Sequence, residues 1–304
     1  MAAARRQQLP LLRRASTIEA INAWVFIIPV TLGTLLLNVL PALPNIYFSL
    51  TEWNGLVAPR FIGFTNYVEF TSDPVFQNSL RVTVIYALGS IPLSIIAGLA
   101  VALLVNRPLR GISFFRAIYY TPHISNIIAI VIVFQYLLAP RFGLINQGLW
   151  HLFGIVGPNW LGDDNAAMVS IIFVSVYTSV GYNMVLFLAG LQGIPQHLYE
   201  AATIDGANSV QKFLRITIPL LSPMIFFVLL LSVIGSFSVF ALVYAMTGGG
   251  PGQSTSVIFF LLYQEAFQQL KFGFASAMAV FMFVIVGILT WVNWWAGKHW
   301  VFYG

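Results

Sequence analysis

Six long intervals of the chain contain no Asp, Glu, Lys or Arg, and this absence constrains the fold more than any other feature. The intervals cover residues 20–51, 82–106, 117–140, 165–199, 216–264 and 272–297. A hydrocarbon core about 30 Å thick needs about 20 apolar residues in helical form, and a charge at its centre costs several kcal/mol. Each interval can therefore hold one membrane span.

The composition agrees with a membrane protein and excludes a water-soluble domain. Of the 304 residues, 59% are hydrophobic and only 8% are charged, whereas a soluble protein has roughly a quarter of its residues charged. The sequence contains no cysteine, which excludes disulfide scaffolds, thiolate zinc sites and cysteine nucleophiles.

The membrane solvent also selects the secondary structure, because only helices and closed barrels satisfy every backbone group in hydrocarbon. Barrel strands alternate in polarity, but windows such as 127–138 are apolar almost throughout, with Gln135 as the exception, and do not alternate. The sequence thus predicts an all-α polytopic membrane protein with six transmembrane helices. The predicted spans are about 22–48, 82–105, 117–139, 167–191, 220–246 and 273–297. A glycine-rich run at 248–252 interrupts the fifth interval, and the remaining segment 253–264 is too short to cross, so we expect it at the membrane interface.

The basic residues set the orientation. With the N-terminus inside, ten of them fall in inner segments and four in outer segments. The inner ones are Arg5, Arg6, Arg13, Arg14, Arg107, Arg110, Arg116, Lys212, Arg215 and Lys298, and the outer ones are Arg60, Arg81, Arg141 and Lys271. By the positive-inside rule both termini are cytoplasmic, with a basic N-terminal segment at 1–19 and a six-helix domain at 20–304. We interpret the N-terminal arginines as a topology determinant beside anionic lipid, and we expect no nucleic-acid partner.

Several segments resemble catalytic or binding motifs but lack a residue or a spacing that such a site needs. The glycine-rich run Thr247–Gly252 resembles a phosphate loop, but Gln253 stands where that loop needs Lys. The four histidines lie in separate segments without the spacing of a metal site, so no metal is expected. Asp163 and Asp164 are adjacent in an outer segment and are interpreted as a solvated loop rather than a catalytic pair. We expect no catalytic residue and no cofactor bound by this chain.

The inner segment 195–219 differs from the other loops. Pro195 suits the first turn of a helix, Gly206 can end that helix, and apolar residues then repeat on one face up to Pro219. Two short helices in a cytoplasmic loop, with the small Ala201 and Ala202 allowing close approach, predict a docking element for a partner's groove. The alternative is an amphipathic loop on lipid headgroups, but two acids and two bases do not match the basic helices that bind lipid.

This segment carries a family resemblance through Glu200, Ala201, Ala202, Gly206, Ile218 and Pro219. With these residues in this spacing, the chain resembles the membrane subunits of binding-protein-dependent ATP-binding-cassette importers. Within that family it looks most like the maltose-type carbohydrate permeases, on the stretches 61–67, 109–116 and 236–251. It departs from the family's pattern at Thr121, which precedes Pro122, and at Ala241, a position that is often acidic.

The resemblance implies the type I importer permease architecture in a bacterial or archaeal cytoplasmic (inner) membrane. The chain would form half of a translocation pathway, beside a second permease subunit, two cytoplasmic ATPase subunits that bind ATP and Mg, and an extracytoplasmic solute-binding protein. The ATPase-coupling residues would be Glu200, Ala201, Ala202, Asp205, Gly206 and Phe213 in the coupling loop 195–219. Closure of the ATPase would then move the helices as rigid bodies and drive alternating access.

Polar or aromatic side chains inside apolar spans are the candidates for the substrate pathway. They are Gln135, Tyr182, Asn183, Ser236 and Ser238. For each of them a hydrogen bond between helices is a competing role. Tyr182 with Asn183 is the best pair, because an aromatic face covers sugar C–H groups while an amide serves hydroxyls. No span has a charge at its centre, which favours a small neutral sugar or oligosaccharide.

Two other functional classes stay open from the sequence. A self-sufficient secondary transporter or channel would usually show an intramembrane charge or an internal repeat. An intramembrane enzyme would need a nucleophile, a metal or a carboxylate set within the spans, and the charge-free intervals contain no obvious one.

Overall fold

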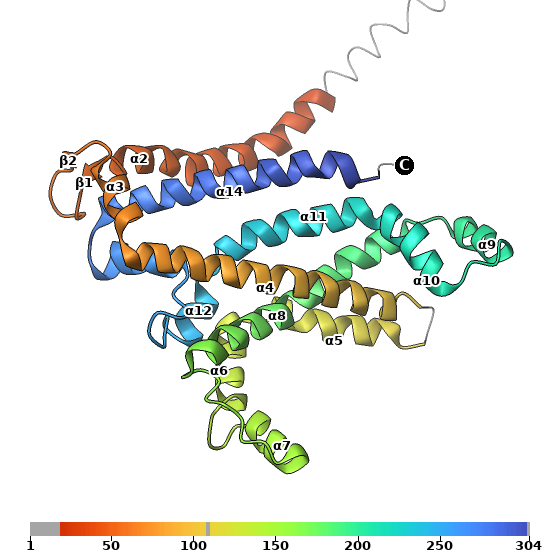
Figure 1. Cartoon of the computed structure of the whole chain (residues 1–304). Coiled ribbons are helices and arrows are strands. Elements are labelled where there is room, and N and C mark those ends of the chain that lie inside the picture. The colour runs from red at the N-terminus through yellow and green to blue at the C-terminus, as the bar shows by residue number, and fades with distance from the viewer. Residues whose placement is uncertain (1–18, 108–109, 303–304) are drawn as a thin grey trace, which may run out of the picture.

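The computed structural model describes residues 19–107 and 110–302, which are almost entirely helical (Figure 1). The helices are Glu19–Phe48, which contains η1 (Leu35–Val39) and α2 (Leu40–Phe48), then α3 (Thr65–Ser72), α4 (Pro74–Val105), α5 (Ile112–Ile124), α6 (Ile127–Leu137), α7 (Leu144–Phe153), α8 (Asp164–Gln192), α9 (Gln196–Ile204), α10 (Ser209–Lys212), η2 (Phe213–Thr217), α11 (Ile218–Phe237), α12 (Ala241–Met246), α13 (Ile258–Tyr263), η3 (Gln264–Gln268) and α14 (Phe272–Trp300). One antiparallel pair of short strands, β1 (Thr51–Glu52) and β2 (Arg60–Phe61), follows the first helix.

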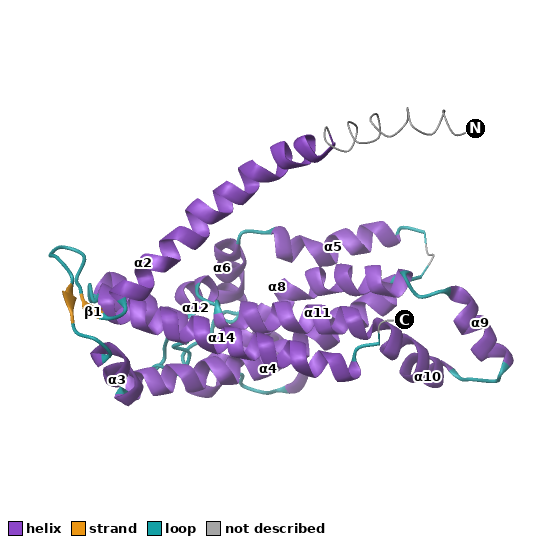
Figure 2. Cartoon of the chain, turned by 90° about the horizontal axis from the view of Figure 1, so that it is seen from above, coloured by secondary structure: helices purple, strands orange, loops and turns teal. Residues whose placement is uncertain are grey.

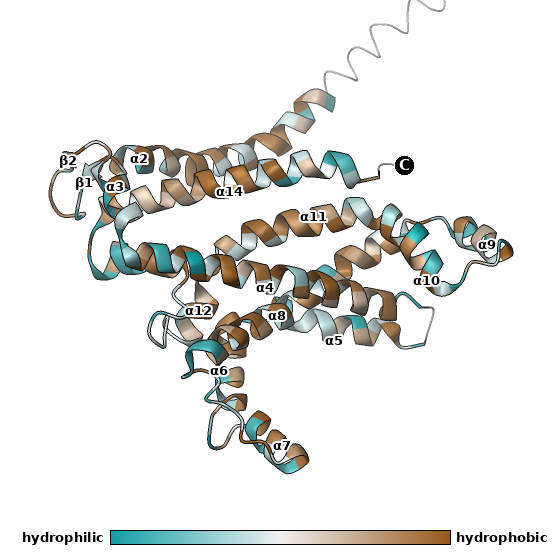
Figure 3. Cartoon of the chain, viewed as in Figure 1, coloured by the Kyte–Doolittle hydropathy of each residue, from teal (hydrophilic) through white to brown (hydrophobic). Residues whose placement is uncertain are grey.

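Five helices in the described ranges are long and apolar enough to cross a membrane. They are Glu19–Phe48, α4, α8, the continuous helix Ser209–Phe237 and α14. The bent pair α5 and α6 makes a sixth span if it is counted as one, which is the number predicted from the sequence. Figure 3 shows that the long helices are predominantly hydrophobic, while hydrophilic residues gather toward their ends and in the connections.

The third span is broken rather than straight. Its two halves, α5 and α6, meet at an angle of 98°. Pro122 lacks a backbone donor, Ser125 is extended, and the Asn126 side chain caps α6 by accepting the backbone N–H of Ile128 at 2.8 Å. The fifth predicted span is also interrupted, because α11 ends at Phe237 and α12 begins only at Ala241. Hydropathy does not detect either break, since the residues on both sides are apolar.

Two spans begin earlier than charge alone predicts. Helix α4 begins at Pro74 rather than near residue 82, because Asp73 caps it and Pro74 suits its first turn. Asp163 caps α8 by accepting the backbone N–H groups of Asn165 and Ala166, and Asp164 is the first residue of that helix. Asp163 is thus an exposed residue of the loop, as predicted, and its carboxylate satisfies free N–H groups of the helix, whereas Asp164 is exposed but already belongs to α8.

Segment 253–264, predicted from the sequence to lie at the membrane interface, is largely buried against other parts of the protein. Val257 and Ile258 are fully buried, and the Ile258 N–H donates to the Thr83 hydroxyl of α4 at 2.9 Å. Thr255 donates to the Gly250 carbonyl at 2.7 Å, so part of the polar backbone of the preceding turn is satisfied locally. This pairing lets the chain re-enter the bundle after Met246 instead of lying at its surface.

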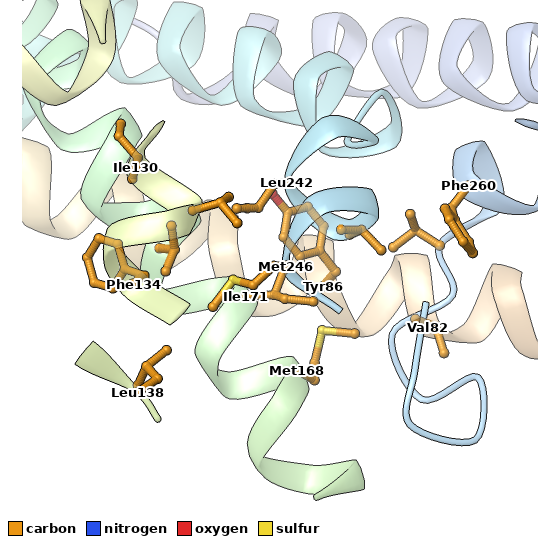
Figure 4. Packing of buried hydrophobic residues seen from close by; sticks show 14 residues of the cluster. Val82, Tyr86, Ile130, Phe134, Leu138, Met168, Ile171, Leu242, Met246 and Phe260 are labelled. Carbon is orange, nitrogen blue, oxygen red and sulfur yellow. The ribbon is translucent and has the colours of Figure 1, made fainter. Parts of the chain in front are cut away.

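Three groups of buried apolar residues hold the bundle together. The first joins α4, α6, α8 and α12 through residues such as Tyr86, Phe134, Ile171 and Leu242 (Figure 4). The second surrounds the first half of α14 and includes Phe70 of α3. The third packs α4 against α8 and α11. The short helices α9 and α10 project from one end of the bundle, and β1, β2 and α3 lie at the other (Figure 1). We call these the α9 end and the β1 end.

The first helix contacts the rest of the chain mainly near its C-terminal end. Phe48 stacks on Trp53 with a centroid distance of 4.2 Å, and Trp53 contacts Phe272 at the start of α14. Toward Glu19 the helix diverges from the other spans (Figure 2). Its apolar side chains, including Trp24 and Phe26, are exposed in the isolated chain.

Candidate functional site

A cavity of about 380 Å³ lies between α4, α5, α8 and α11, next to the break between α5 and α6. It is lined by Tyr86, Ser90, Ile91, Ser94, Pro122, His123, Ser125, Ile127, Ser175, Thr178, Ser179, Tyr182, Asn183, Leu231, Ser232, Gly235 and Ser236. Most of these residues carry a hydroxyl group. None of the lining residues that the structure describes is Asp, Glu, Lys or Arg.

Close helix contacts fix the cavity wall contributed by α8. A Cβ atom added to Gly98 of α4 would lie 2.5 Å from the Asn183 Cβ, so only glycine permits this approach. Because the two helices are this close, the Asn183 side chain donates a hydrogen bond to the Ser94 carbonyl at 3.2 Å. On the other side of α8, a Cβ at Gly181 would lie 2.1 Å from the Tyr119 carbonyl oxygen. The two glycines hold Tyr182 and Asn183 between α4 and α5.

Several hydroxyl groups of the wall donate to their own helices. Ser94 donates to Ile91, Thr178 and Ser179 donate to Ser175, and Ser236 donates to Val233, at 2.7 to 3.0 Å. A hydroxyl oxygen that donates in this way keeps its lone pairs. These side chains therefore offer acceptors rather than donors to a molecule in the cavity.

His123 and Tyr182 form the aromatic part of the wall. Their rings stack with a centroid distance of 4.8 Å and an interplanar angle of 21°, and Tyr120 lies at 5.6 Å from the histidine ring. Among the described residues, neither His123 nor the Tyr182 hydroxyl has a hydrogen-bond partner. This stacked pair offers the cavity an apolar face together with polar groups that are free to donate.

The structure brings together three of the five residues predicted for the substrate pathway. Tyr182, Asn183 and Ser236 line the cavity. Gln135 lies elsewhere and donates to the carbonyls of Ala245 and Met246 at 2.9 and 3.3 Å, which joins α6 to α12. Ser238 is exposed at the break after α11 and donates to the Ile234 carbonyl at 3.3 Å. The substrate roles of all five stay predictions.

Sequence reasoning missed the other polar residues of the wall, although a signal was present. Tyr86, Ser90 and Ser94 recur at intervals of four, which places them on one face of α4. Ser175 and Ser179 of α8 have the same spacing, as do Ser232 and Ser236 of α11. Such polar stripes inside apolar spans indicate faces that meet one another or line a cavity.

The loop at the α9 end is a second candidate site. Pro195 precedes α9, Gly206 follows it with a φ of +77°, and Asn208 and Gln211 form a reciprocal capping box on α10. The two predicted short helices are present, but the second continues without a break into α11, so Pro219 lies inside a long helix. The π-helical turn η2 (Phe213–Thr217) precedes Pro219.

Two hydrogen bonds close this loop on itself. The Tyr199 and Thr217 hydroxyls lie 2.9 Å apart, and the Lys212 ammonium donates to the Thr203 hydroxyl at 2.7 Å. Glu200, Ala201, Asp205 and Gly206 are exposed, while Ala202 and Phe213 are half-buried. Three apolar side chains also face outward, with Ile204 87% exposed, Val210 64% and Leu214 58%. An ordered loop with an exposed apolar surface at its tip suits contact with another protein.

A bundle of apolar spans around a polar cavity, with an ordered helical loop at one end, is the architecture of a membrane permease. The family model described as "Binding-protein-dependent transport system inner membrane component" matches residues 90–296. The chain belongs to this family, which confirms the resemblance found in the sequence.

Relatives and a solved structure agree with this assignment. The chain is 38% identical to the probable ABC transporter permease protein YurN of Bacillus subtilis (strain 168), over 88% of this chain and 92% of that protein. It is 33% identical to the lactose transport system permease protein LacF of Rhizobium radiobacter, over 92% and 95%. Its fold matches a chain of a bacterial alginate ABC transporter with a TM-score of 0.79 at 19% identity, over 91% and 94%. The fold is that of the type I importer permeases.

Proposed function

We propose that this chain is the permease subunit of an ATP-driven sugar importer and forms half of its translocation pathway. The observation that carries the proposal is the uncharged, hydroxyl-rich cavity between α4, α5, α8 and α11, because α8 and α11 are also the two helices that flank the loop at the α9 end. A substrate in the cavity and a partner on the loop would thus act on the same two helices.

The chemistry of the cavity favours a neutral polyhydroxylated substrate. Side chains that present lone pairs accept hydrogen bonds from substrate hydroxyls, and the same lone pairs repel a carboxylate. The stacked rings of His123 and Tyr182 would cover the C–H face of a sugar ring, while their free polar atoms donate to its oxygens. The names of the relatives support this class, since LacF is named for lactose transport.

The loop containing Glu200, Ala201, Ala202 and Gly206 would couple the chain to a cytoplasmic ATPase subunit. Its exposed apolar residues would enter a groove of that subunit. ATP and Mg would be bound by two such ATPase subunits, and a second permease subunit and an extracytoplasmic solute-binding protein would complete the assembly. The α9 end then faces the cytoplasm, and the chain resides in the cytoplasmic membrane of a bacterium or archaeon.

Site-specific crosslinking tests this function. The chain has no cysteine, so an Ala202→Cys variant carries a single reactive thiol. The tagged variant is purified from native membranes after crosslinking, and the products are identified by mass spectrometry. We expect an ATPase crosslinked at this position and co-purification of a second permease and a solute-binding protein. Val57→Cys, an exposed position at the β1 end, is the matched control and should capture no ATPase. A chain recovered alone would contradict the proposal and favour a self-sufficient secondary transporter.

A further inference from the structure

We propose that Val301 and Phe302, which follow α14, form a strap that ties α14 to α11 and makes α14 move with the coupling loop. The proposal rests on the proposed function and adds a mechanical role for α14 and for Ser222 of α11. Ser222 is then a positioning residue for coupling, distant from the cavity and outside the loop itself.

Ser222 is the attachment point of the strap. The Phe302 N–H donates to the Ser222 hydroxyl oxygen at 2.8 Å, and this hydroxyl donates in turn to the Pro219 carbonyl at 2.7 Å. The serine is 3% exposed, so water does not compete for either hydrogen bond. The backbone N–H of a residue beyond α14 is thereby attached to α11.

Close packing beside Ser222 reinforces the attachment. A Cβ atom at Gly297 would lie 2.6 Å from Cε2 of Phe226, so the glycine admits the phenyl ring directly against the α14 backbone. Trp300 meets the same ring edge-on with a centroid distance of 6.3 Å. The strap thus combines one hydrogen bond with an aromatic contact, both directed from the end of α14 to α11.

A continuous helix connects the coupling loop to this attachment point. Ser209–Phe237 is one continuous helix, so α10, η2 and Ser222 belong to a single rod. The Tyr199–Thr217 and Lys212–Thr203 hydrogen bonds fasten α9 to the same rod. A displacement imposed on the loop therefore reaches Ser222 through one continuous helix, which includes the π-helical turn η2.

The other end of α14 is anchored in the elements at the β1 end. The Gly273 N–H donates to the Trp53 carbonyl at 3.0 Å, and Phe272 contacts the Trp53 ring at 5.6 Å. Phe274 packs edge-on against Phe70 of α3. With the strap closed, α14 links the coupling loop to the segments where an external solute-binding protein would dock, some 29 helical residues away.

The test uses variants that remove the hydrogen bond from either side. Ser222→Ala removes the acceptor, and Phe302→Pro removes the donor. Val301 already has the extended conformation that a following proline requires (φ −82°, ψ 124°). Phe302→Ala is the matched control, because it keeps the N–H and removes only an exposed side chain. The readout is the ratio of ATPase activity with the solute-binding protein to activity without it, in the purified complex in liposomes.

We expect each of the two variants to lower this ratio about fivefold, the effect of losing one hydrogen bond, with complex yield and unstimulated ATPase unchanged. The double variant should be no worse than either single one, because both remove the same bond. Unchanged ratios, or additive effects in the double variant, would overturn the strap. A parallel fall in yield and unstimulated activity would indicate a merely structural contact and would also overturn it.

A cysteine pair supplies an independent measurement. The double variant Ser222→Cys/Phe302→Cys can form a disulfide in place of the hydrogen bond. When reduced, it should show the lowered stimulation ratio. When disulfide-linked, it should return to the wild-type ratio, because a permanent link between α14 and α11 is enough for coupling. Inactivity on oxidation would mean that the contact opens during transport, which contradicts the proposal. Failure of the proposed function is distinguishable, since the wild-type complex would then show no stimulation at all.

Discussion

At the scale of single residues, two tyrosines of α8 differ in whether they line the cavity. Tyr182 lines the cavity and stacks on His123, whereas Tyr177 packs against Phe134 and does not line it. We expect Tyr182→Ala to raise the KM for sugar uptake by more than tenfold, because both the stacking face and the hydroxyl are lost. Tyr182→Phe keeps the face and should raise KM by about two- to tenfold, the range for one hydrogen bond.

Uptake of labelled maltose or lactose by cells that contain the whole importer measures this effect. Tyr177→Phe removes a hydroxyl from the same helix outside the cavity, so it should transport like the wild type. If Tyr177→Phe and Tyr182→Phe behaved alike, the cavity would not be the substrate site. His123→Phe extends the comparison, since it retains a stacking ring and removes the nitrogen atoms.

Glycine positions allow a residue-scale prediction about stability. Gly181→Ala would place a Cβ atom 2.1 Å from the Tyr119 carbonyl oxygen, so α5 and α8 must separate. We expect a loss of roughly 1–3 kcal/mol in the free energy of unfolding, as for other overpacked contacts. Gly287→Ala in α14, where nothing lies within 4 Å, is the control and should be neutral or stabilising. Thermal unfolding of the purified chain in detergent compares the two, and equal midpoints would contradict the close packing.

At the scale of elements, the sequence predicts how many spans exist better than where they bend. Charge-free intervals identify the apolar segments because a buried charge is costly, and this argument does not depend on tertiary contacts. The breaks at Ser125 and Ser238 depend on what each segment meets after the turn. The packing of α6 against α12 and α8 replaces lipid contacts with protein contacts, and no local pattern encodes that choice. The burial of α13 escaped prediction for the same reason.

Gln135 illustrates the difference between a polar residue and its role. Its amide joins α6 to the end of α12, so Gln135→Leu would leave the Ala245 and Met246 carbonyls without this donor. We expect α12 to loosen, and hydrogen exchange across 241–247 to become about fivefold faster, which corresponds to a hydrogen bond of about 1 kcal/mol. Mass spectrometry of exchanged peptides tests this, with α9 peptides as an internal control. A raised KM with unchanged exchange would instead favour the substrate role predicted from the sequence.

At the scale of the whole molecule, the charges of the chain separate by end. Six of the nine acidic residues lie toward the β1 end of the spans: Glu52, Glu69, Asp73, Asp163, Asp164 and Glu265. Ten of the fourteen basic residues fall in the segments predicted to be inner. By the positive-inside rule we predict that the α9 end lies in the cytoplasm, which is also the side where an ATPase would meet the coupling loop.

Thiol labelling in intact cells tests this orientation. The test uses two variants, Val57→Cys at the β1 end and Ile204→Cys at the tip of α9. Both side chains are highly exposed, at 63% and 87%, so any difference in their labelling reports the side of the membrane on which each lies. A membrane-impermeant maleimide should label Cys variants at 57 in intact cells, and at 204 only after permeabilisation. The reverse pattern would place the coupling loop outside, where no ATPase can reach it. Labelling of both positions in intact cells would show that the chain inserts in two orientations, and the charge asymmetry would then be too weak to set the topology.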